Sequence, residues 1–305
     1  MKKIGLLYGM EKSFPEAVLN YINDIGSGKV VAEFVKIGPC CYDSIAEYDV
    51  IFDLVSNEVP FYRSLLKHFA INNVKIVNNP FFSSEDDEFL HNSLAKLNSF
   101  PVPKTVILPS KEHPYGTCSE TFQNLIYPID WNKIFDYIGF PAIIKPNFNT
   151  PMQSSFKIYN INEFFAAFDN TGNNSMVLQE CIDYDNYFRC FTIGKKHTKI
   201  TDYNPTKPHH LRYTSNSFEL SEELKNKMFE YSINVSTLFD FDFNTMEFAI
   251  KGNQLYIIDF LNQAPSCQKA FLKKEVFDWL VEKTSKMLIE KTKQRKQKFN
   301  YFFSV

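Results

Sequence analysis

Residues 140–147 read FPAIIKPN, an apolar segment of strand length that carries a single lysine, Lys145, near its end. A second apolar segment, residues 177–182 (VLQECI), carries an acid, Glu180, near its own end. Short apolar runs of this kind are typical of strands that are buried on one or both faces. A charged side chain after a strand is more often a solvated strand end than a functional group, so the surrounding segments decide its meaning.

Before this stretch, strand-like and helical patterns alternate along the chain. Strands are predicted at residues 3–8, 30–36, 49–55 and 74–77, and helices at residues 15–22 and 61–71. Strands that alternate with helices in this way indicate βαβ units. The sequence therefore predicts a doubly wound parallel sheet in an N-terminal α/β domain, residues 1–82.

The rest of the chain mixes its elements differently. Gly194-Lys195 suits the positive-φ turn of a hairpin, and Ser83-Ser84, followed by four acids, suits the start of a helix. We expect an α+β arrangement with a central lobe over residues 83–182 and a C-terminal lobe over residues 183–305. Helices are predicted at residues 131–138, 163–168, 222–239 and 269–290, a loop at 110–128, and strands at 142–145, 155–159, 176–180, 188–193, 196–201, 245–250 and 255–260.

Composition excludes several classes of function. The 305 residues carry a formal net charge of −2, so no broad electrostatic field favours nucleic acid or a membrane surface as a partner. No apolar run approaches the length of a membrane span. The six cysteines form no CxxC pair, which is most simply explained by unpaired thiols in a reducing cytoplasm.

Four short motifs together resemble a known superfamily. Pro103-Lys104-Thr105, Phe140-Pro141 with Lys145-Pro146, Gln179-Glu180 with Ile182, and Asp259 with Asn262 occur in the order and spacing of the ATP-grasp superfamily. The chain looks like its carboxylate–amine ligases, the glutamate and D-alanine ligase types, over nearly its whole length. The resemblance implies an ATP-grasp fold, with residues 1–82 as the leading domain, and ATP and Mg²⁺ as cofactors.

The resemblance also implies a nucleotide site. Lys104 and Lys145 would neutralise phosphate oxygens as point charges. Gln179 to Ile182 would present backbone groups, together with the Glu180 carboxylate, to the adenine. Asp183, with Asp185 as the alternative, would accept hydrogen bonds from the ribose.

A metal site is expected from two neighbouring strands near the C-terminus. Glu247, Asp259 and Asn262 would supply two carboxylates and an amide, which are oxygen donors suited to magnesium. An acid in the apolar run around Asp259 is costly to bury without a cation or a partner, so we expect Asp259 to be a buried ligand.

Arginines are expected to handle the acceptor. By the resemblance, Arg189 would stabilise the charge that develops when a carboxylate attacks the γ-phosphate. Arg212, in a loop bounded by prolines, would help to hold the acceptor, with His209 or His210 as a neighbour. The implied partners are a small-molecule or peptide carboxylate and an amine, and the family habit of dimerisation makes a homodimer an expectation.

Two departures leave other functions open. The superfamily often has a glycine-rich phosphate loop at the position of residues 147–155, but this segment contains no glycine. The spacing from Asp259 to Asn262 is one residue longer than in the Glu-x-Asn form, as a bulge at the end of the strand would allow. One alternative is a small-molecule kinase similar to the inositol polyphosphate kinases, favoured by the basic residues Lys195, Lys196, Lys199, Lys207 and Arg212. The other is a nucleotide-binding protein without catalytic activity.

Overall fold

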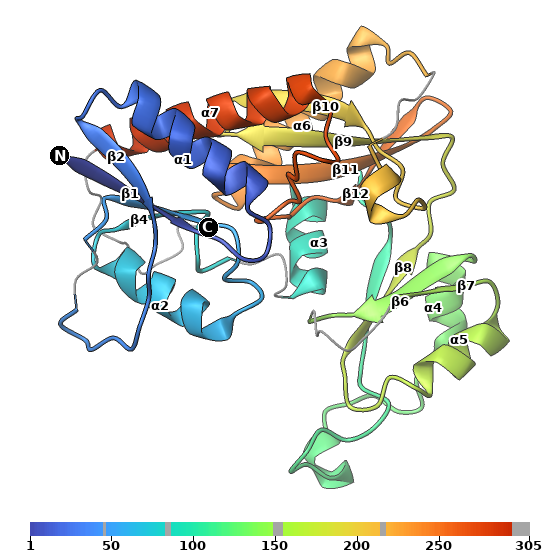
Figure 1. The fold of residues 1–305 in the computed structure, drawn as a ribbon. Coiled ribbons are helices and arrows are strands. Elements are labelled where there is room, and N and C mark those ends of the chain that lie inside the picture. The colour runs from blue at the N-terminus through green and yellow to red at the C-terminus, as the bar shows by residue number, and fades with distance from the viewer. Residues whose placement is uncertain (45–46, 83–86, 149–154, 214–217, 295–305) are drawn as a thin grey trace. The chain divides into compact units, whose positions relative to one another are not determined.

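The computed structural model describes residues 1–44, 47–82, 87–148, 155–213 and 218–294 (Figure 1). Its contacts divide the chain into two compact units. Unit 1 comprises Met1–Ser84, Tyr187–Phe248 and Asp259–Val305, and unit 2 comprises Glu85–Asn186 and Ala249–Ile258. The domain boundaries predicted after residues 82 and 182 describe a different division, and they stay predictions.

Unit 1 begins with the expected parallel sheet. Its strand order is β2-β1-β3-β4, and the three pairings are all parallel. The sheet is doubly wound, because β2 lies beside β1 on one side and β3 lies beside it on the other. The elements are β1 (Lys2–Leu7), α1 (Ser13–Ile25), β2 (Val30–Phe34), β3 (Val50–Asp53), α2 (Pro60–Ile71) and β4 (Lys75–Val77).

Helices cover both faces of this sheet. Ile4, Leu6 and Phe52 point to one face, where they share a core with α1 and with the C-terminal helix α7 (Lys274–Lys293). Leu7 and Ile51 point to the other face and pack against α2. Alternate residues of a strand point to opposite faces, so these continuous apolar strands require cover on both sides.

A second sheet has the order β10-β9-β11-β12. Its first hairpin turns at Gly194 and Lys195, whose φ angles are 61° and 57°, as a tight hairpin turn requires. The pairing runs antiparallel from Ile193 opposite His197 to Phe188 opposite Asp202. The elements are β9 (Asn186–Ile193), β10 (His197–Asp202), the 3₁₀ turn η2 (His209–Leu211), α6 (Glu222–Leu238), β11 (Phe243–Lys251) and β12 (Gln254–Asp259).

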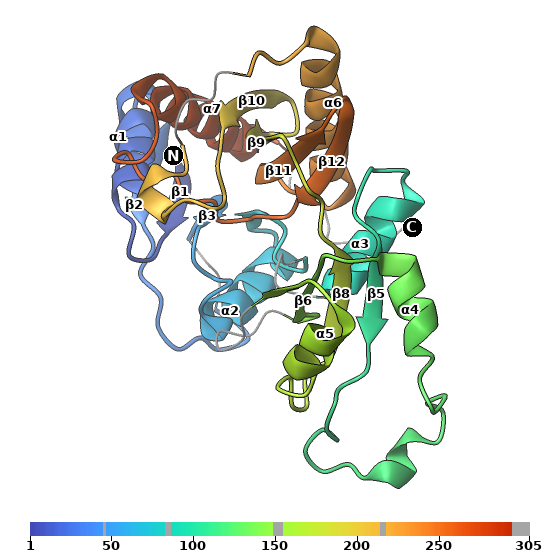
Figure 2. The same cartoon turned by 90° about the vertical axis from the view of Figure 1, so that its right-hand side faces the viewer.

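Unit 2 contains the third sheet, with the order β5-β8-β6-β7 and antiparallel pairing throughout. Leu108, Ile144 and Leu178 lie on one face of it, in a core shared with α4 and α5. This leaves the other face for polar side chains. The elements are α3 (Glu88–Leu97), β5 (Thr105–Leu108), η1 (Ser119–Phe122), α4 (Trp131–Ile138), β6 (Ala142–Pro146), β7 (Phe156–Ile158), α5 (Ile161–Phe168) and β8 (Met176–Glu180); Figure 2 shows them from a second side.

The predicted fold class is confirmed, with differences in detail. Helix α7 begins at Lys274, after a non-helical start at residues 269–273, and residues 110–128 include the short η1. The expected cap at Ser83-Ser84 lies outside the described residues; Asp87 caps α3 by accepting from the backbone N–H of Leu90 at 2.9 Å. Across the described residues, no helix combines the length and apolarity that a bilayer crossing demands.

Within unit 1, Asn78 joins the parallel sheet to the start of β11. Its buried side-chain amide donates to the backbone oxygen of Phe243 at 2.6 Å and accepts from the backbone N–H of the same residue at 2.8 Å. Asn78→Ala leaves two buried backbone groups without these bonds. We expect the free energy of unfolding to fall by about 3 kcal/mol, measured by urea denaturation.

The matched control is Asn98→Ala, which removes an exposed amide at the end of α3. This variant should lose less than about 1 kcal/mol. Equal losses for the two variants would show that Asn78 is not a structural tie.

Candidate functional site

The polar face of the unit 2 sheet carries two of the predicted nucleotide ligands. Gln179 on β8 lies opposite Thr105 on β5 and Ile143 on β6, and Lys145 lies two residues further along β6. Because side chains alternate between faces, Thr105, Gln179 and Lys145 project from the same face, opposite the apolar core. The strand pattern thus places Lys145 and Gln179 on the same face of the sheet, and their roles as nucleotide ligands stay a prediction.

Helix α3 supplies the partners of these side chains. The Lys145 ammonium contacts the Glu88 carboxylate at 2.7 Å, and the Asn92 amide donates to the same carboxylate at 2.8 Å. The Gln179 amide donates to the hydroxyl of Thr105 at 2.9 Å and reaches the Asn92 amide oxygen at 3.4 Å. One chain of polar contacts therefore runs from Lys145 across α3 to β5.

Glu88 is charged within this network. Burial alone would raise the pKa of its carboxyl, but the Lys145 ammonium and the hydrogen bonds from Lys145 and Asn92 hold that pKa below its ordinary value. Sequence reasoning assigned Glu88 only to the acidic first turn of a helix. The α-helical spacing of Glu88 and Asn92 placed both on one face, but only the packing of α3 shows that this face meets Lys145.

The predicted adenine segment lies at the end of β8. The backbone N–H of Glu180 donates to the oxygen of Lys104 at 2.9 Å, and the Glu180 carboxylate accepts from the Lys104 N–H at 3.3 Å. The Lys104 ammonium is 5.5 Å from the ring centroid of Tyr137, so the two predicted phosphate lysines have separate partners. Ile182 is half-buried and Asp183 is exposed.

Asp185, the alternative ribose ligand, has a structural task in the same unit. Its carboxylate accepts from the backbone N–H of Gly252 at 2.7 Å, and its own N–H donates to the oxygen of Ile250 at 2.8 Å. These bonds hold the turn between β11 and β12. Asp183 is therefore the better placed of the two acids to meet a ligand.

Unit 1 gathers a second set of predicted residues around Arg189. The Arg189 side chain, only 6% exposed, forms an ion pair with Glu247 and donates to the hydroxyls of Tyr203 at 2.7 Å and Tyr213 at 2.8 Å. Its Cζ atom lies 3.8 Å from the centroid of the Tyr203 ring, a stacked cation–π contact. The hydroxyl of Tyr187 donates to the other Glu247 oxygen at 2.6 Å.

Three tyrosines thus enclose one buried ion pair. Burial raises the pKa of Tyr213 and of Tyr203, so both hydroxyls keep their protons at neutral pH. The Nε atom of Arg189 is buried without a hydrogen-bond partner in the described structure. Tyr187, Tyr203 and Tyr213 were not predicted as site residues, because an aromatic residue in a strand is most often core packing.

Arg212 joins the same cluster through Tyr203. It donates to the Tyr203 hydroxyl at 3.3 Å and to the backbone oxygen of Lys207 at 3.1 Å. Both predicted catalytic arginines therefore converge on one phenol. His209 packs edge-on against Phe271, and partial burial together with Arg212 and Arg189 lowers its pKa, so it is neutral at neutral pH.

The predicted metal ligands are in different situations. Both Glu247 oxygens already accept hydrogen bonds, from Tyr187 and Arg189. Asp259, the last residue of β12, is exposed, so the expectation of a buried acid there is wrong: the chain leaves the sheet at this point. The Asn262 backbone N–H donates to the Asn244 side chain at 2.9 Å.

The donor types nonetheless fit magnesium, since the set offers carboxylate and amide oxygens. In the part of the chain that the structure describes, no three side chains of His, Cys, Asp or Glu gather at one point as a metal cluster. The magnesium ligands therefore stay a prediction. The glycine-free segment at residues 149–154 lies outside the described residues.

A crevice of about 270 Å³ opens at the carboxyl ends of β1 and β3. Here the doubly wound sheet changes direction, which is where open α/β sheets usually bind ligands. Glu11 and Glu58 line the crevice together with residues 264–268, and the Ser266 hydroxyl is buried without a hydrogen-bond partner in the described structure. Glu11, two residues after Gly9 and just beyond the first strand, was the sequence signal that could have identified this crevice.

Comparison with known proteins gives the class of the fold. No protein-family model matches the chain, and no curated protein matches it by sequence. Comparison of structures does find matches, and the chain has the ATP-grasp fold.

Three solved structures illustrate the likeness. The D-alanine–D-alanine ligase of Bacillus anthracis complexed with ATP is 15% identical, with a TM-score of 0.65, covering 96% of this chain and 97% of that one. A RimK domain ATP-grasp protein of Sphaerobacter thermophilus is 12% identical, with a TM-score of 0.66 and coverage of 96% and 100%. The VanG D-Ala:D-Ser ligase of Enterococcus faecalis is 13% identical, with a TM-score of 0.64 and coverage of 95% and 99%.

The buried ion pair of unit 1 can be tested by Glu247→Gln. The substitution keeps the shape of the side chain but leaves the Arg189 charge without its counter-ion, so we expect a loss of about 3 kcal/mol in the free energy of unfolding. Chemical denaturation measures it.

Glu223→Gln is the control, because Glu223 pairs with Lys227 on the exposed face of α6 at 2.7 Å. An exposed pair is worth less than about 1 kcal/mol. A loss for Glu247→Gln no larger than that of the control would contradict a stabilising buried pair.

Proposed function

We propose that this chain is an ATP- and magnesium-dependent ligase that activates a carboxylate as an acyl phosphate, which an amine then attacks. The observation that carries the proposal is the polar row on the unit 2 sheet, where Lys145 and Gln179 project from the face opposite the apolar core. The ATP-grasp fold supports it, since the solved structures of this fold named above include a D-alanine–D-alanine ligase and a D-Ala:D-Ser ligase.

Residues of unit 2 receive the nucleotide in this proposal. Lys145 and Lys104 neutralise phosphate oxygens, and the end of β8 offers Glu180 and the backbone as far as Ile182 to the adenine. Asp183 accepts from the ribose. Gln179 is engaged by Thr105 and Asn92, so its role is to hold the polar face in place.

The chemistry balances as two substitutions. A carboxylate oxygen attacks the γ-phosphorus of ATP, and the bond to the bridging oxygen breaks to release ADP. The amine nitrogen then attacks the carbonyl carbon of the acyl phosphate, phosphate leaves, and the nitrogen loses a proton to give the amide. Magnesium, held by Asp259 and Asn262 with Glu247, would shield phosphate charge in the first substitution.

Residues of unit 1 act on the acceptor. Arg189 is already positioned by two phenols and a carboxylate, so its charge is fixed in space, as stabilisation of a developing oxyanion requires. Arg212 approaches the same cluster from its loop. The crevice lined by Glu11 and Glu58 carries two carboxylates, of which that of Glu11 already accepts from Ser13 and Phe14. We assign the Glu58 side of the crevice to an ammonium group, which favours amino acids or peptides as substrates. We place the reaction in the cytoplasm, where ATP is available and thiols stay reduced.

The kinase alternative is less well supported. Two of the lysines that favoured it have acidic partners: Lys195 pairs with Asp240, and Lys196 pairs with Glu290 at 2.9 Å. An acid therefore lies beside each of these two lysines, so the local charge that a polyphosphate acceptor would meet is nearer to balance than the sequence suggests.

The test is ATP binding followed by ADP release, both with Mg²⁺ titrated, over one panel of amino acids and short peptides and one panel of polyols. Lys145→Ala should weaken ATP binding about tenfold, because one charge-assisted contact to phosphate is lost. Lys133→Ala, on the exposed side of α4, is the control and should leave affinity unchanged. ADP release with polyols alone would identify a kinase, and ATP binding without ADP release a non-catalytic protein.

Glu88 offers an independent test of the nucleotide site. In the structure its carboxylate neutralises Lys145, so a triphosphate has to compete with it for the same ammonium. Glu88→Gln should tighten ATP binding about fivefold, because the competing charge is gone while the side-chain shape remains. Isothermal titration measures it, with the exposed Glu120→Gln as the control.

A weaker affinity for Glu88→Gln would mean that Glu88 positions Lys145 for the nucleotide. In that case Lys145→Ala should abolish any further effect of the Glu88 substitution.

A further inference from the structure

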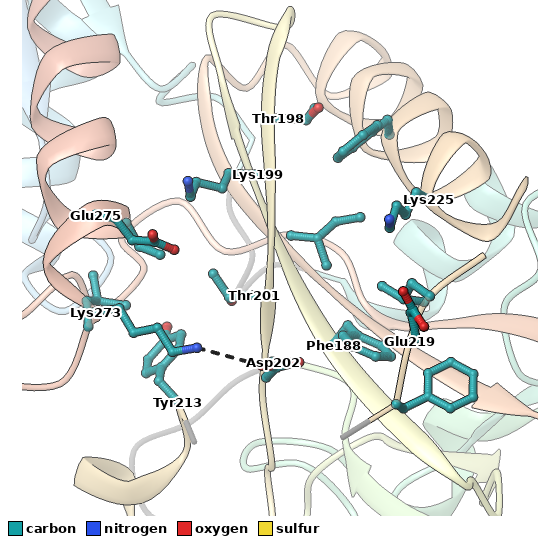
Figure 3. Close-up of a pocket in the computed structure, with 16 residues that line it drawn as sticks. Phe188, Thr198, Lys199, Thr201, Asp202, Tyr213, Glu219, Lys225, Lys273 and Glu275 are labelled. Atoms are coloured by element: carbon teal, nitrogen blue, oxygen red, sulfur yellow. Dashed lines mark ion pairs between the residues drawn. The ribbon is translucent and has the colours of Figure 1, made fainter. Parts of the chain in front are cut away.

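A groove follows β10, a strand of unit 1 that forms the free edge of the second sheet. Strand β10 lies at one end of the order β10-β9-β11-β12, and within the described residues no strand pairs with its outer side. A cavity of about 470 Å³ runs beside it and touches every residue from Thr198 to Asp202. One wall comes from residues 218–229, at the start of α6, and the other from residues 272–276, at the start of α7 (Figure 3).

The backbone of β10 presents hydrogen-bonding groups to this groove. Tyr203 donates its N–H to the oxygen of Tyr187 on β9, so the residues in step with Tyr203, including Thr201 and Lys199, direct their backbone groups toward β9. In an antiparallel pair this orientation alternates, so the N–H and C=O groups of Thr198, Ile200 and Asp202 point outward. An extended chain laid in the groove would meet a ready set of donors and acceptors.

Charges are distributed unequally along the groove. Figure 3 shows charges of both signs at each end of β10. Toward the Thr198 end Lys199 and Lys225 outnumber Glu275, and toward the other end Asp202 and Glu219 outnumber Lys273. Lys273 contacts Asp202 at 4.0 Å, and Lys225 also pairs with Glu222 at 2.8 Å. Both pairs are partly exposed and therefore weak, so a ligand can compete for these groups.

This polarity matches one direction of an added strand. A peptide antiparallel to β10 would have its amino end beside Asp202 and its carboxyl end beside Thr198. Its terminal ammonium would face Asp202 and Glu219, and its terminal carboxylate would face Lys199 and Lys225. From Thr198 to Asp202 the strand extends about 13 Å, which corresponds to three or four peptide residues.

We propose that the groove binds a short peptide with free termini, three or four residues long, as a strand added antiparallel to β10. Backbone pairing along a sheet edge gives affinity, and side pockets accept alternate side chains. Phe188, Phe229 and Val276 supply apolar surface for those side chains. Residues 214–217 lie outside the described residues.

A second copy of the chain does not fit the same groove. Symmetric pairing of two β10 strands requires one patch to be complementary to itself. Here the strand edge lies in a hollow between the starts of α6 and α7, and two hollows do not interlock. The proposal needs neither ATP nor turnover, so it stands or falls separately from the ligase assignment.

The experiment is a titration of the full chain with the tripeptide Ala-Val-Ala in the absence of nucleotide. Calorimetry measures the affinity, and amide NMR locates the binding site. Amidation of the peptide carboxyl group and acetylation of its amino group should each weaken binding about fivefold, the worth of one partly exposed charge contact. Shift changes should centre on Thr198, Ile200 and Asp202.

Variants assign the two ends of the peptide. Lys225→Ala should weaken binding of the free peptide about fivefold and should not affect binding of the amidated peptide. Glu219→Gln should likewise weaken binding of the free peptide about fivefold and should not affect binding of the acetylated peptide. Lys227→Ala, one helical turn from Glu223 on α6, is the matched control and should bind like the parent chain.

The proposal is overturned if Ala-Val-Ala fails to bind at concentrations up to about 10 mM. It is equally overturned if blocking either terminus leaves affinity unchanged. Self-association of the chain that Lys225→Ala abolishes would assign the groove to a second copy instead. The peptide modifications alone decide the outcome if a variant fails to fold.

Discussion

A permanent positive charge buried on β9 constrains much of unit 1. Arg189 cannot lose its proton, and removing a guanidinium from water is costly unless its donors find partners. The partners of Arg189 are Glu247 from β11, Tyr203 from the end of β10 and Tyr213 from the following loop. The strands β10 and β11 have to keep their register with β9, because a shift of one residue would turn the partner to the other face.

Unit 2 contains a second ion pair, between Lys145 and Glu88. Lys145 sits on the polar face of a sheet whose other face is committed to aromatic packing around Trp131 and Phe164. Helix α3 crosses the polar face and supplies Glu88, so a lysine suited to phosphate is held by a carboxylate until something competes for it. In both units a cation is held in place by partners from other segments of the chain.

Much of this architecture was predictable from local patterns. The helix over residues 131–138 was predicted with its start at Asp130 and its end at Gly139, and the structure has the same bounds because both signals are local: Asp130 accepts from Lys133, and Gly139 has a φ of 76°. The hairpin at Gly194-Lys195 was predicted for the same reason. By contrast, the start of the last helix was placed five residues too early, since residues 269–273 contain no cap that marks the boundary.

The sequence by itself determined the elements, the apolar face of each strand and the residue types available for chemistry, because hydrophobic period and turn chemistry act over a few neighbouring residues. Only the tertiary structure decided which polar groups meet. Lys145 with Glu88 and Arg189 with Glu247 are pairs separated by more than fifty residues. It also left Asp259 exposed and β10 at an edge beside a groove, since exposure and edges depend on what packs alongside, which no local pattern records.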